Sequence, residues 1–383
     1  MKLLVFSPYY PPHTGGLETH SEEFNRHLAE RGVEIVVFTP RLPMDAPELE
    51  TTSSIKTIRF PDYEIISNYP LPKYAPIFIS PKVLALFFRL WKESPNIIIS
   101  RTRFFNTSLL ALFYAKLKHV PIVHIEHGSD FVQLSNPITS VLAKLYDYTF
   151  GRVIFRYSSI NISISKAVQV FINRFDKRKS PVIYRGLDFD AIDAISKDTS
   201  IRKRHPGKII LATAARLYKW KGIENTIEAI RLLSKEMQSQ IVFLIIGDGE
   251  DFDHLKNSSK NLPIEILGRL SREDTIAILK SIDIYIHSSF PGGGLSTSLL
   301  EAMYCECSVI ATPNEGAIEI IRHKKNGILI QESSPEAIQQ ALQAFLAKES
   351  ARESFGEQAR NTITENFSWE KSIHAYLDIF KTL

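Results

Sequence analysis

Apolar and polar positions alternate along the chain with two different periods. Short runs rich in Ile, Val, Leu and Phe predict buried strands, and longer segments with apolar residues three and four positions apart predict helices. Strands that alternate with helices form parallel sheets covered on both faces, and such sheets bind ligands at the carboxyl ends of their strands. The pattern therefore predicts an α/β fold of the doubly wound type.

The alternation occurs twice along the chain. A polar stretch at 186–207 separates the two series and is typical of an interdomain connection. We expect strands of the first series at 2–7, 33–39, 55–60, 96–100, 121–126, 160–165 and 181–184, and strands of the second series at 209–214, 240–246, 263–267, 282–287 and 308–311. The sequence thus predicts one domain at 1–187, a second at 188–368, and a last helix within 369–383.

Length and composition agree with two globular domains. The 383 residues are 44% hydrophobic and 23% charged, enough for a core in each half. No apolar run is long enough to cross a membrane, and the first residues, MKLLVFSPYYPP, predict a strand and not a signal peptide. The two cysteines, Cys305 and Cys307, have neither zinc nor redox spacing. Sparing use of cysteine fits a reducing compartment, so we expect a cytoplasmic protein.

The net charge of +4 is unevenly distributed. Residues 66–187 contain 17 basic and 5 acidic residues. Within that segment, 81–93 and 138–156 mix apolar and aromatic residues with Lys and Arg. These two stretches could be ordinary buried helices, or they could present a basic, aromatic surface to anionic lipid at the cytoplasmic membrane face. A solvated basic face without a partner is a further alternative. No nucleic-acid-binding motif is present, so we expect no nucleic-acid partner.

The stretch 288–302, SSFPGGGLSTSLLEA, carries the strongest chemical signal. It follows an apolar strand, turns at three glycines, and opens into a helix expected at 299–304. The N–H groups of residues 296–298 lie where that helix begins and would attract a phosphate. Glu301 is close enough to reach a hydroxyl of the same ligand. The alternative is purely structural: Ser298 and Glu301 also fit a capping box.

Candidate ligand-binding residues follow three other predicted strands. Gly15 and Gly16 come after the first strand, before a helix. His127 follows IVHIE, where a histidine could be a base, an acid, a donor to a sugar hydroxyl or a core residue. Arg216 and Lys221 follow the strand at 209–214, where they could hold a departing diphosphate or be solvated loop cations.

Together these motifs resemble those of the retaining glycosyltransferases of family 4 (glycosyltransferase group 1). The family's GRL…KG motif resembles 215–222, its GDG turn 247–249, and the second half of its E-x7-E motif the LEAM at 300–303. The resemblance implies the GT-B fold, in which two Rossmann-like domains face each other across a cleft. NFSWE at 366–370 resembles the start of the last helix, which in that fold completes the first, acceptor-binding domain.

The resemblance also implies the roles of individual residues. His127, Arg216 and Lys221 would be catalytic. The nucleotide sugar would be bound, mostly by the second domain, through Gly15, Gly16, Arg216, Lys221, Gly247, Leu267, Gly294, Leu295, Ser296, Thr297 and Glu301. The chain departs from the family at Gly293, where a first glutamate is usual, and at Arg185, where the PNGVD motif has asparagine.

The sequence therefore predicts a retaining glycosyltransferase that moves a sugar from a nucleoside diphosphate sugar to an acceptor hydroxyl. The acceptor would be a glycan or a lipid-linked or cell-surface glycan precursor. Positive side chains would replace a metal, so we expect neither metal nor cofactor. A nucleotide-sugar epimerase of the same fold and a non-catalytic nucleotide-sugar-binding protein are the alternatives; Gly293 favours the second of these.

Overall fold

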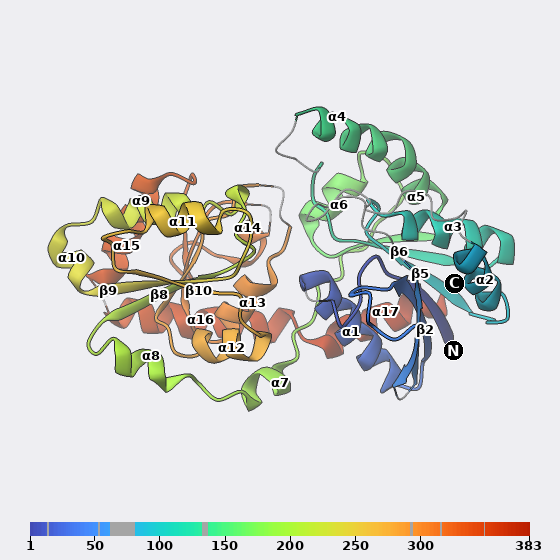
Figure 1. Cartoon of the computed structure of the whole chain (residues 1–383), viewed down its shortest axis with the longest axis horizontal. Helices are drawn as coiled ribbons and strands as arrows, with labels where there is room; N and C mark the ends of the chain where they lie inside the picture. Colours follow the sequence, from blue (N-terminus) through green and yellow to red (C-terminus); the bar gives the residue numbers. More distant parts are fainter. Residues whose placement is uncertain are drawn as a thin grey trace. The chain divides into compact units, whose positions relative to one another are not determined.

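The chain forms two compact units. The computed structural model describes residues 1–13, 15–52, 54–61, 81–131, 137–291, 294–314, 316–347 and 349–383. The first unit comprises Met1–Gly186 together with Trp369–Leu383, and the second comprises Leu187–Ser368 (Figure 1). Each unit contains one sheet with helices on both faces. The prediction of a doubly wound α/β architecture is confirmed.

The first unit is built on a seven-stranded sheet in the order β3-β4-β2-β1-β5-β6-β7. All neighbouring strands are parallel except β3, which pairs antiparallel with β4 at one edge. The strands are β1 (Lys2–Phe6), β2 (Glu34–Pro40), β3 (Leu49–Thr52), β4 (Ile55–Phe60), β5 (Ile97–Arg101), β6 (Ile122–Glu126) and β7 (Ile160–Ser163). The helices are α1 (Gly16–Ala29), α2 (Pro81–Leu90), α3 (Asn106–Lys118), α4 (Pro137–Tyr146), the π-helical turn η2 (Asp147–Gly151), α5 (Arg152–Tyr157), α6 (Lys166–Ile172) and α17 (Trp369–Lys381).

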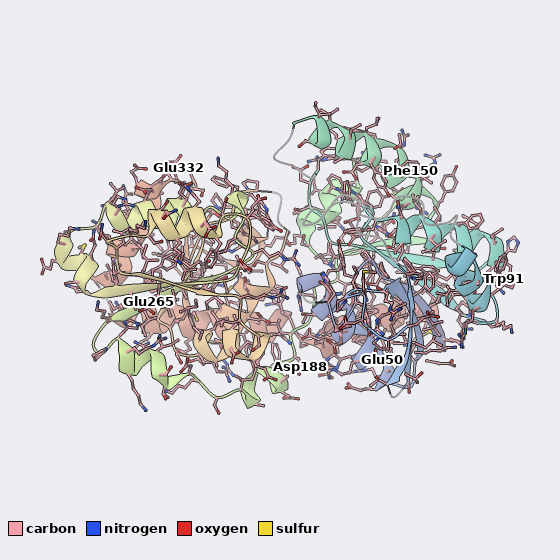
Figure 2. The ribbon with its side chains drawn as sticks, in the orientation of Figure 1. Glu50, Trp91, Phe150, Asp188, Glu265 and Glu332 are labelled. Atoms are coloured by element: carbon pink, nitrogen blue, oxygen red, sulfur yellow. The ribbon has the colours of Figure 1, made fainter. Side chains whose placement is uncertain are left out.

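Successive residues of β1 enter different cores, which is why that strand is apolar throughout. Leu3 and Val5 pack in the cluster that α1 and α17 cover. Leu4 and Phe6 pack in the cluster that α2 and α3 cover. Side chains fill the space between the sheet and both helical layers (Figure 2). The sheet is therefore buried on both faces, and its polar groups are concentrated at strand ends.

The second unit is built on a six-stranded parallel sheet in the order β10-β9-β8-β11-β12-β13. Its strands are β8 (Ile209–Ala214), β9 (Ile241–Ile246), β10 (Ile264–Gly268), β11 (Ile284–His287), β12 (Ser308–Ala311) and β13 (Ile328–Leu329). Its helices are α7 (Phe189–Ala194), α8 (Thr199–Arg204), the 3-10 turn η3 (Lys219–Lys221), α9 (Ile223–Arg231), α10 (Lys235–Ser239), α11 (Phe252–Ser258), α12 (Arg272–Leu279), α13 (Thr297–Tyr304), α14 (Ala317–Ile320), α15 (Pro335–Leu346) and α16 (Glu349–Asn366). In Figure 1, α9, α11 and α15 cover one face, and α12, α13 and α16 cover the other.

One sequence-based expectation is wrong. Residues 181–184 do not form a strand: Val182 makes only an isolated bridge to Ser163, because the chain leaves the sheet edge after that single contact. The stretch 186–207 begins at the boundary between the units, as expected of an interdomain connection, but most of it belongs to the second unit. It contains α7 and α8, and α7 is fixed within the second unit by a hydrogen bond from the Tyr304 hydroxyl to Asp193 (2.8 Å) and by stacking of Phe189 on Tyr304.

The chain crosses between the units twice, and the two crossings lie next to each other. The N–H of Leu187 donates to the carbonyl of Phe367 at 2.8 Å. A Cβ on Gly186 would lie 2.5 Å from the Trp369 backbone, so only glycine permits this approach. Glu23 of α1 receives hydrogen bonds from Arg185 (3.2 Å) and from the Trp369 indole (3.1 Å). Arg185, one of the departures from the family motif, is thus a buried ion-pair partner at the crossing.

None of the helices in the described parts of the chain combines the length and the apolar character needed to span a bilayer.

Candidate active site

Arg216 lies in the loop after β8, next to the tight turn formed by residues 247–249. The N–H of Leu217 donates to the carbonyl of Asp248 at 3.0 Å. Gly247 has a positive φ of 140°, and a Cβ there would lie 1.8 Å from the carbonyl oxygen of Ala215. The GDG turn therefore packs directly against the backbone on either side of Arg216, in an approach that a side chain would prevent.

The second cation, Lys221, ends the 3-10 turn that follows. The hydroxyl of Ser288 donates to the Lys221 carbonyl at 2.9 Å, and the N–H of Phe290 donates to the Trp220 carbonyl at 2.8 Å. These bonds fix the turn to the loop after β11. The ammonium of Lys221 lies 4.1 Å from the centre of the Trp220 ring, a favourable cation–π distance. Two strand-end loops therefore meet at Lys221.

Lys221 lies in a positive environment. Burial and the neighbouring Arg216 lower the pKa of the Lys221 ammonium to about 8. Burial and Lys221 in turn lower the pKa of His287 to about 3, so this histidine at the end of β11 is neutral. Among the described residues, Lys221 makes no ion pair. Two neighbouring cations without a carboxylate for Lys221 favour the binding of an anion.

The loop after β11 ends in a capped helix. Ser296 is the N-cap of α13 and accepts the Leu299 N–H at 3.4 Å, so the helix begins at Thr297, two residues earlier than expected. The capping box between Ser298 and Glu301 is wrong, because Ser298 is inside the helix and accepts from the Tyr285 hydroxyl at 2.9 Å.

Glu301 is instead held by a guanidinium. Its carboxylate accepts from Arg272 Nε of α12 at 2.9 Å. Gly294 has a left-handed backbone and Leu295 is buried, while Gly292 and Gly293 lie outside the described residues. Leu267 is half-buried near the end of β10. The second unit thus gathers Arg216, Lys221, Gly247 and the start of α13 at the carboxyl ends of its strands, as the sequence predicted.

In the first unit, the glycine pair begins α1. Gly15 is the N-cap of α1. Because glycine has no side chain, it cannot cap the first N–H groups of the helix. Its carbonyl accepts from the N–H of Thr19 at 3.1 Å and from the Thr19 hydroxyl at 3.0 Å. Glu18 in the first turn is hydrogen-bonded to the His13 imidazole. Gly16 therefore lies in the first turn of an uncapped helix, which suits an anion.

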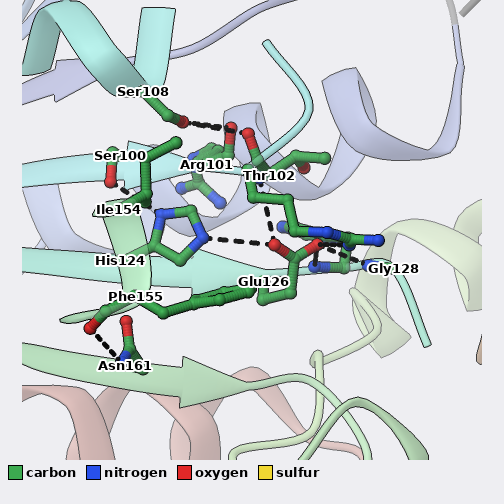
Figure 3. A network of polar contacts seen from close by, with 12 residues as sticks. Ser100, Arg101, Thr102, Ser108, His124, Glu126, Gly128, Ile154, Phe155 and Asn161 are labelled. Atoms are coloured by element: carbon green, nitrogen blue, oxygen red, sulfur yellow. Dashed lines mark hydrogen bonds and ion pairs between the residues drawn. The ribbon is translucent and has the colours of Figure 1, made fainter. Parts of the chain in front are cut away.

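His127 follows β6 on a loop that one buried carboxylate organises. Glu126 accepts the N–H groups of His127 (2.9 Å), Gly128 (2.7 Å) and Arg103 (3.0 Å), and also pairs with the Arg103 guanidinium at 3.2 Å (Figure 3). Burial would raise the pKa of Glu126, but Arg103, His124 and the Gly128 N–H together lower it to about 2. The ionised Glu126 thereby fixes the backbone that carries His127.

The His127 ring is neutral. Burial and the charge of Arg101 lower its pKa to about 3, with a further contribution from Arg185. The ring packs edge to face on His20, with 4.9 Å between centroids. Its Nε2 is buried and has no hydrogen-bond partner among the described residues. His127 can therefore donate or accept one hydrogen bond but carries no charge near neutral pH.

Comparison with known proteins decides the family. Residues 14–191 match the family described as Glycosyltransferase Family 4, and residues 196–362 match Glycosyl transferases group 1. An uncharacterized glycosyltransferase of Methanocaldococcus jannaschii is 41% identical over 391 residues, which cover 100% of this chain and 99% of the relative. The chain belongs to the family 4 glycosyltransferases.

Solved structures confirm the GT-B fold of this glycosyltransferase. Sucrose-phosphate synthase from Thermosynechococcus elongatus matches with a TM-score of 0.82 at 16% identity, covering 100% of this chain and 98% of the other. HepE from Anabaena in complex with UDP-glucose matches with a TM-score of 0.77 at 17% identity, covering 100% of both chains.

The residues that the sequence analysis missed are mainly those that hold the glycosyltransferase's candidate site in place. Arg103 joins Glu126 to Asp147 through a 2.8 Å bond from its Nε, and Arg272 orients Glu301. Arg103 is 23 residues from Glu126 and 44 from Asp147, and Arg272 is 29 residues from Glu301, separations that no local pattern reveals. Of these residues, only Glu126 could have been recognised in the sequence. It is a carboxylate inside an apolar strand, where a buried charge needs a partner.

Proposed function

We propose that this glycosyltransferase moves a sugar from a nucleoside diphosphate sugar to an acceptor hydroxyl, with retention at the anomeric carbon. The observation that carries the proposal is the pair of cations at the carboxyl edge of the second sheet, Arg216 and Lys221, of which Lys221 lacks a carboxylate partner in the described structure. The complex of the similarly folded HepE with UDP-glucose supports this donor class.

The two cations would act on the leaving group. As the bond to the sugar breaks, negative charge develops on the diphosphate, and a fixed guanidinium and ammonium stabilise that charge more strongly than they stabilise the substrate. The N–H groups at Ser296 and Thr297, where α13 begins, would add hydrogen bonds to the same oxygens.

Two further groups would position the donor. Glu301, fixed by Arg272, would accept a hydrogen bond from a ribose hydroxyl, while Gly247, Leu267, Gly294 and Leu295 would form the surrounding surface. Neutral His127 would hydrogen-bond a hydroxyl of the transferred sugar. The proposed reaction is front-face attack by the acceptor hydroxyl, whose proton passes to the departing phosphate. Because the cations supply the positive charge, we propose that no metal is needed.

Donor turnover with and without acceptor tests this function. UDP-, GDP- and ADP-sugars would be incubated with candidate glycan and lipid-linked acceptors, in the presence of EDTA, and the product anomer read by proton NMR. We expect transfer that needs an acceptor, keeps the donor's anomeric configuration and survives EDTA. Conversion of donor alone would indicate an epimerase, and binding without turnover would indicate a binding protein. An inverted product would contradict the retaining mechanism.

Nucleotide affinity should depend on pH through Lys221. Its pKa of about 8 lies below the ordinary value of 10.5, so the free protein loses this proton as the pH rises through about 8. A bound diphosphate favours the protonated form, and binding should therefore weaken by about tenfold between about pH 7 and about pH 9.5. Calorimetric titration measures this change. Lys221→Arg, whose guanidinium stays charged, should bind with little pH dependence over the same range.

A further inference from the structure

One surface of the first unit is apolar and basic, although it is exposed. It follows the helical run α4–η2–α5, Pro137–Tyr157. Eight apolar or aromatic side chains described on this run are between 39% and 69% exposed: Ile138, Val141, Leu142, Leu145, Tyr148, Phe150, Val153 and Tyr157. Lys144, Arg152 and Arg156 are exposed among them. We call these eleven residues the apolar–basic face.

The same run also has a conventional buried side. Ala143, Ile154 and Phe155 are buried, and Asp147, its one acidic residue, is buried in the ion pair with Arg103. The exposed apolar residues therefore lie outside the core of the unit. A soluble monomer rarely exposes so many neighbouring apolar side chains, and a cluster of this size usually marks an interaction site.

The neighbouring helices extend the surface with the same chemistry. Phe113 and Leu117 of α3 are exposed, and the Lys116 ammonium lies 5.6 Å from the centre of the Tyr157 ring. Trp91, just after α2, is partly exposed and lies under the Lys118 ammonium at 4.3 Å. The labels α4, α5, α3 and α2 follow one another along one margin of the unit in Figure 1, and Phe150 and Trp91 are labelled on that margin in Figure 2.

We infer that the apolar–basic face docks on a membrane that carries anionic lipid. Aliphatic side chains would enter the boundary between head groups and acyl chains, and tyrosine and phenylalanine suit that depth because their rings tolerate both environments. Lysine and arginine extend their long stems toward lipid phosphates from the same helix. The exposed side chains described on Pro137–Tyr157 include no carboxylate that a phosphate would repel.

Charge argues against a second copy of the chain as the occupant. A symmetric dimer places the same patch on both sides of the interface, so the cations of both copies, Lys144, Arg152 and Arg156 from each, would enter one interface together. Like charges brought together in this way are unfavourable. An anionic bilayer instead supplies negative charge and an apolar layer together, and both match this face.

Vesicle co-sedimentation tests the inference on the full-length protein. Vesicles of phosphatidylcholine alone would be compared with vesicles that contain phosphatidylglycerol. We expect binding to the anionic vesicles that weakens with added salt. Leu142→Glu/Leu145→Glu should weaken it by about tenfold or more, because two exposed apolar anchors are lost. Arg152→Gln/Arg156→Gln should weaken binding to anionic vesicles by about tenfold and reduce its salt dependence.

Two control variants test whether vesicle binding depends on the apolar–basic face and not on any change of an exposed residue. Val170→Glu changes an exposed apolar residue of α6 in the same unit and should bind vesicles like the wild type. Arg216→Ala, in the second unit, should also bind normally, so a failed transferase proposal would not affect this test. Absence of binding to anionic vesicles overturns the inference, as does binding that the leucine and arginine variants leave unchanged. A wild-type dimer that Leu142→Glu/Leu145→Glu dissociates would overturn it in favour of self-association.

Discussion

Arg216→Ala/Lys221→Ala should lower kcat/KM for sugar transfer by about 10³-fold or more and remove thermal stabilisation by nucleoside diphosphates. Loss of a single group that stabilises developing charge costs about 10²–10³-fold in rate, and here two neighbouring cations are removed. Arg216 lies on a loop and Lys221 at the end of a three-residue 3-10 turn, so the fold should survive their truncation. Steady-state kinetics and a thermal-shift series with UDP, GDP and ADP measure the two effects.

Lys219→Ala is the matched control for that experiment. Lys219 is an exposed lysine on the same 3-10 turn as Lys221, and its loss removes one positive charge from the same segment without changing either proposed phosphate-binding side chain. Its variant should keep nucleotide stabilisation and most of the activity. If the double variant is still stabilised by the same nucleotide as the wild type, the diphosphate does not bind where we propose.

Glu126→Ala should destabilise the first unit by about 3–5 kcal/mol, because it leaves the buried Arg103 guanidinium with one carboxylate in place of two. The variant also loses the acceptor for three backbone N–H groups around His127. We therefore expect reduced transfer in the fraction that remains folded. Hydrogen exchange at β6, measured against denaturant, reports the stability of this unit separately from that of the other.

Asp130→Ala provides the comparison for Glu126. Asp130 lies on the same loop and pairs with Arg174, but both side chains are substantially exposed. Exposed pairs contribute about 0–1 kcal/mol, so this variant should be close to the wild type. Equal losses of stability in the two variants would contradict the role that we assign to burial at Glu126.

Periodicity predicted the sheets well because both are parallel and buried on two faces. The strands at 55–60, 209–214 and 308–311 are found with those bounds. β3 was missed because its four residues, LETT, are all exposed and include only one apolar residue. α16 was missed because its sequence is largely polar: it is anchored by the buried Ala359 and Ile363 together with polar contacts such as that of Arg360 with Asp193, which have no sequence periodicity.

The candidate site residues at strand ends could be found from the sequence, but the residues that hold them in place could not. A glycine, histidine or basic residue just after an apolar run can be recognised from the sequence alone. His127 and Arg216 were selected in this way. The contact of Gly247 with Ala215 and the pairing of Glu301 with Arg272 depend on how neighbouring strands and helices pack. The capping box was wrong because the helix begins two residues earlier than expected, with Ser296 as its N-cap, and because the Glu301 carboxylate pairs with Arg272.

Helix α17 gives the protein an unusual order of assembly. Trp369, Ile373, Tyr376 and Phe380 belong to the core beside β1 and α1, which precede the second unit along the chain. All residues of the second unit emerge before this helix does, since synthesis runs from the amino end. The half of the molecule that is begun first is therefore finished last, and during translation its sheet keeps an open apolar face until the last helix arrives.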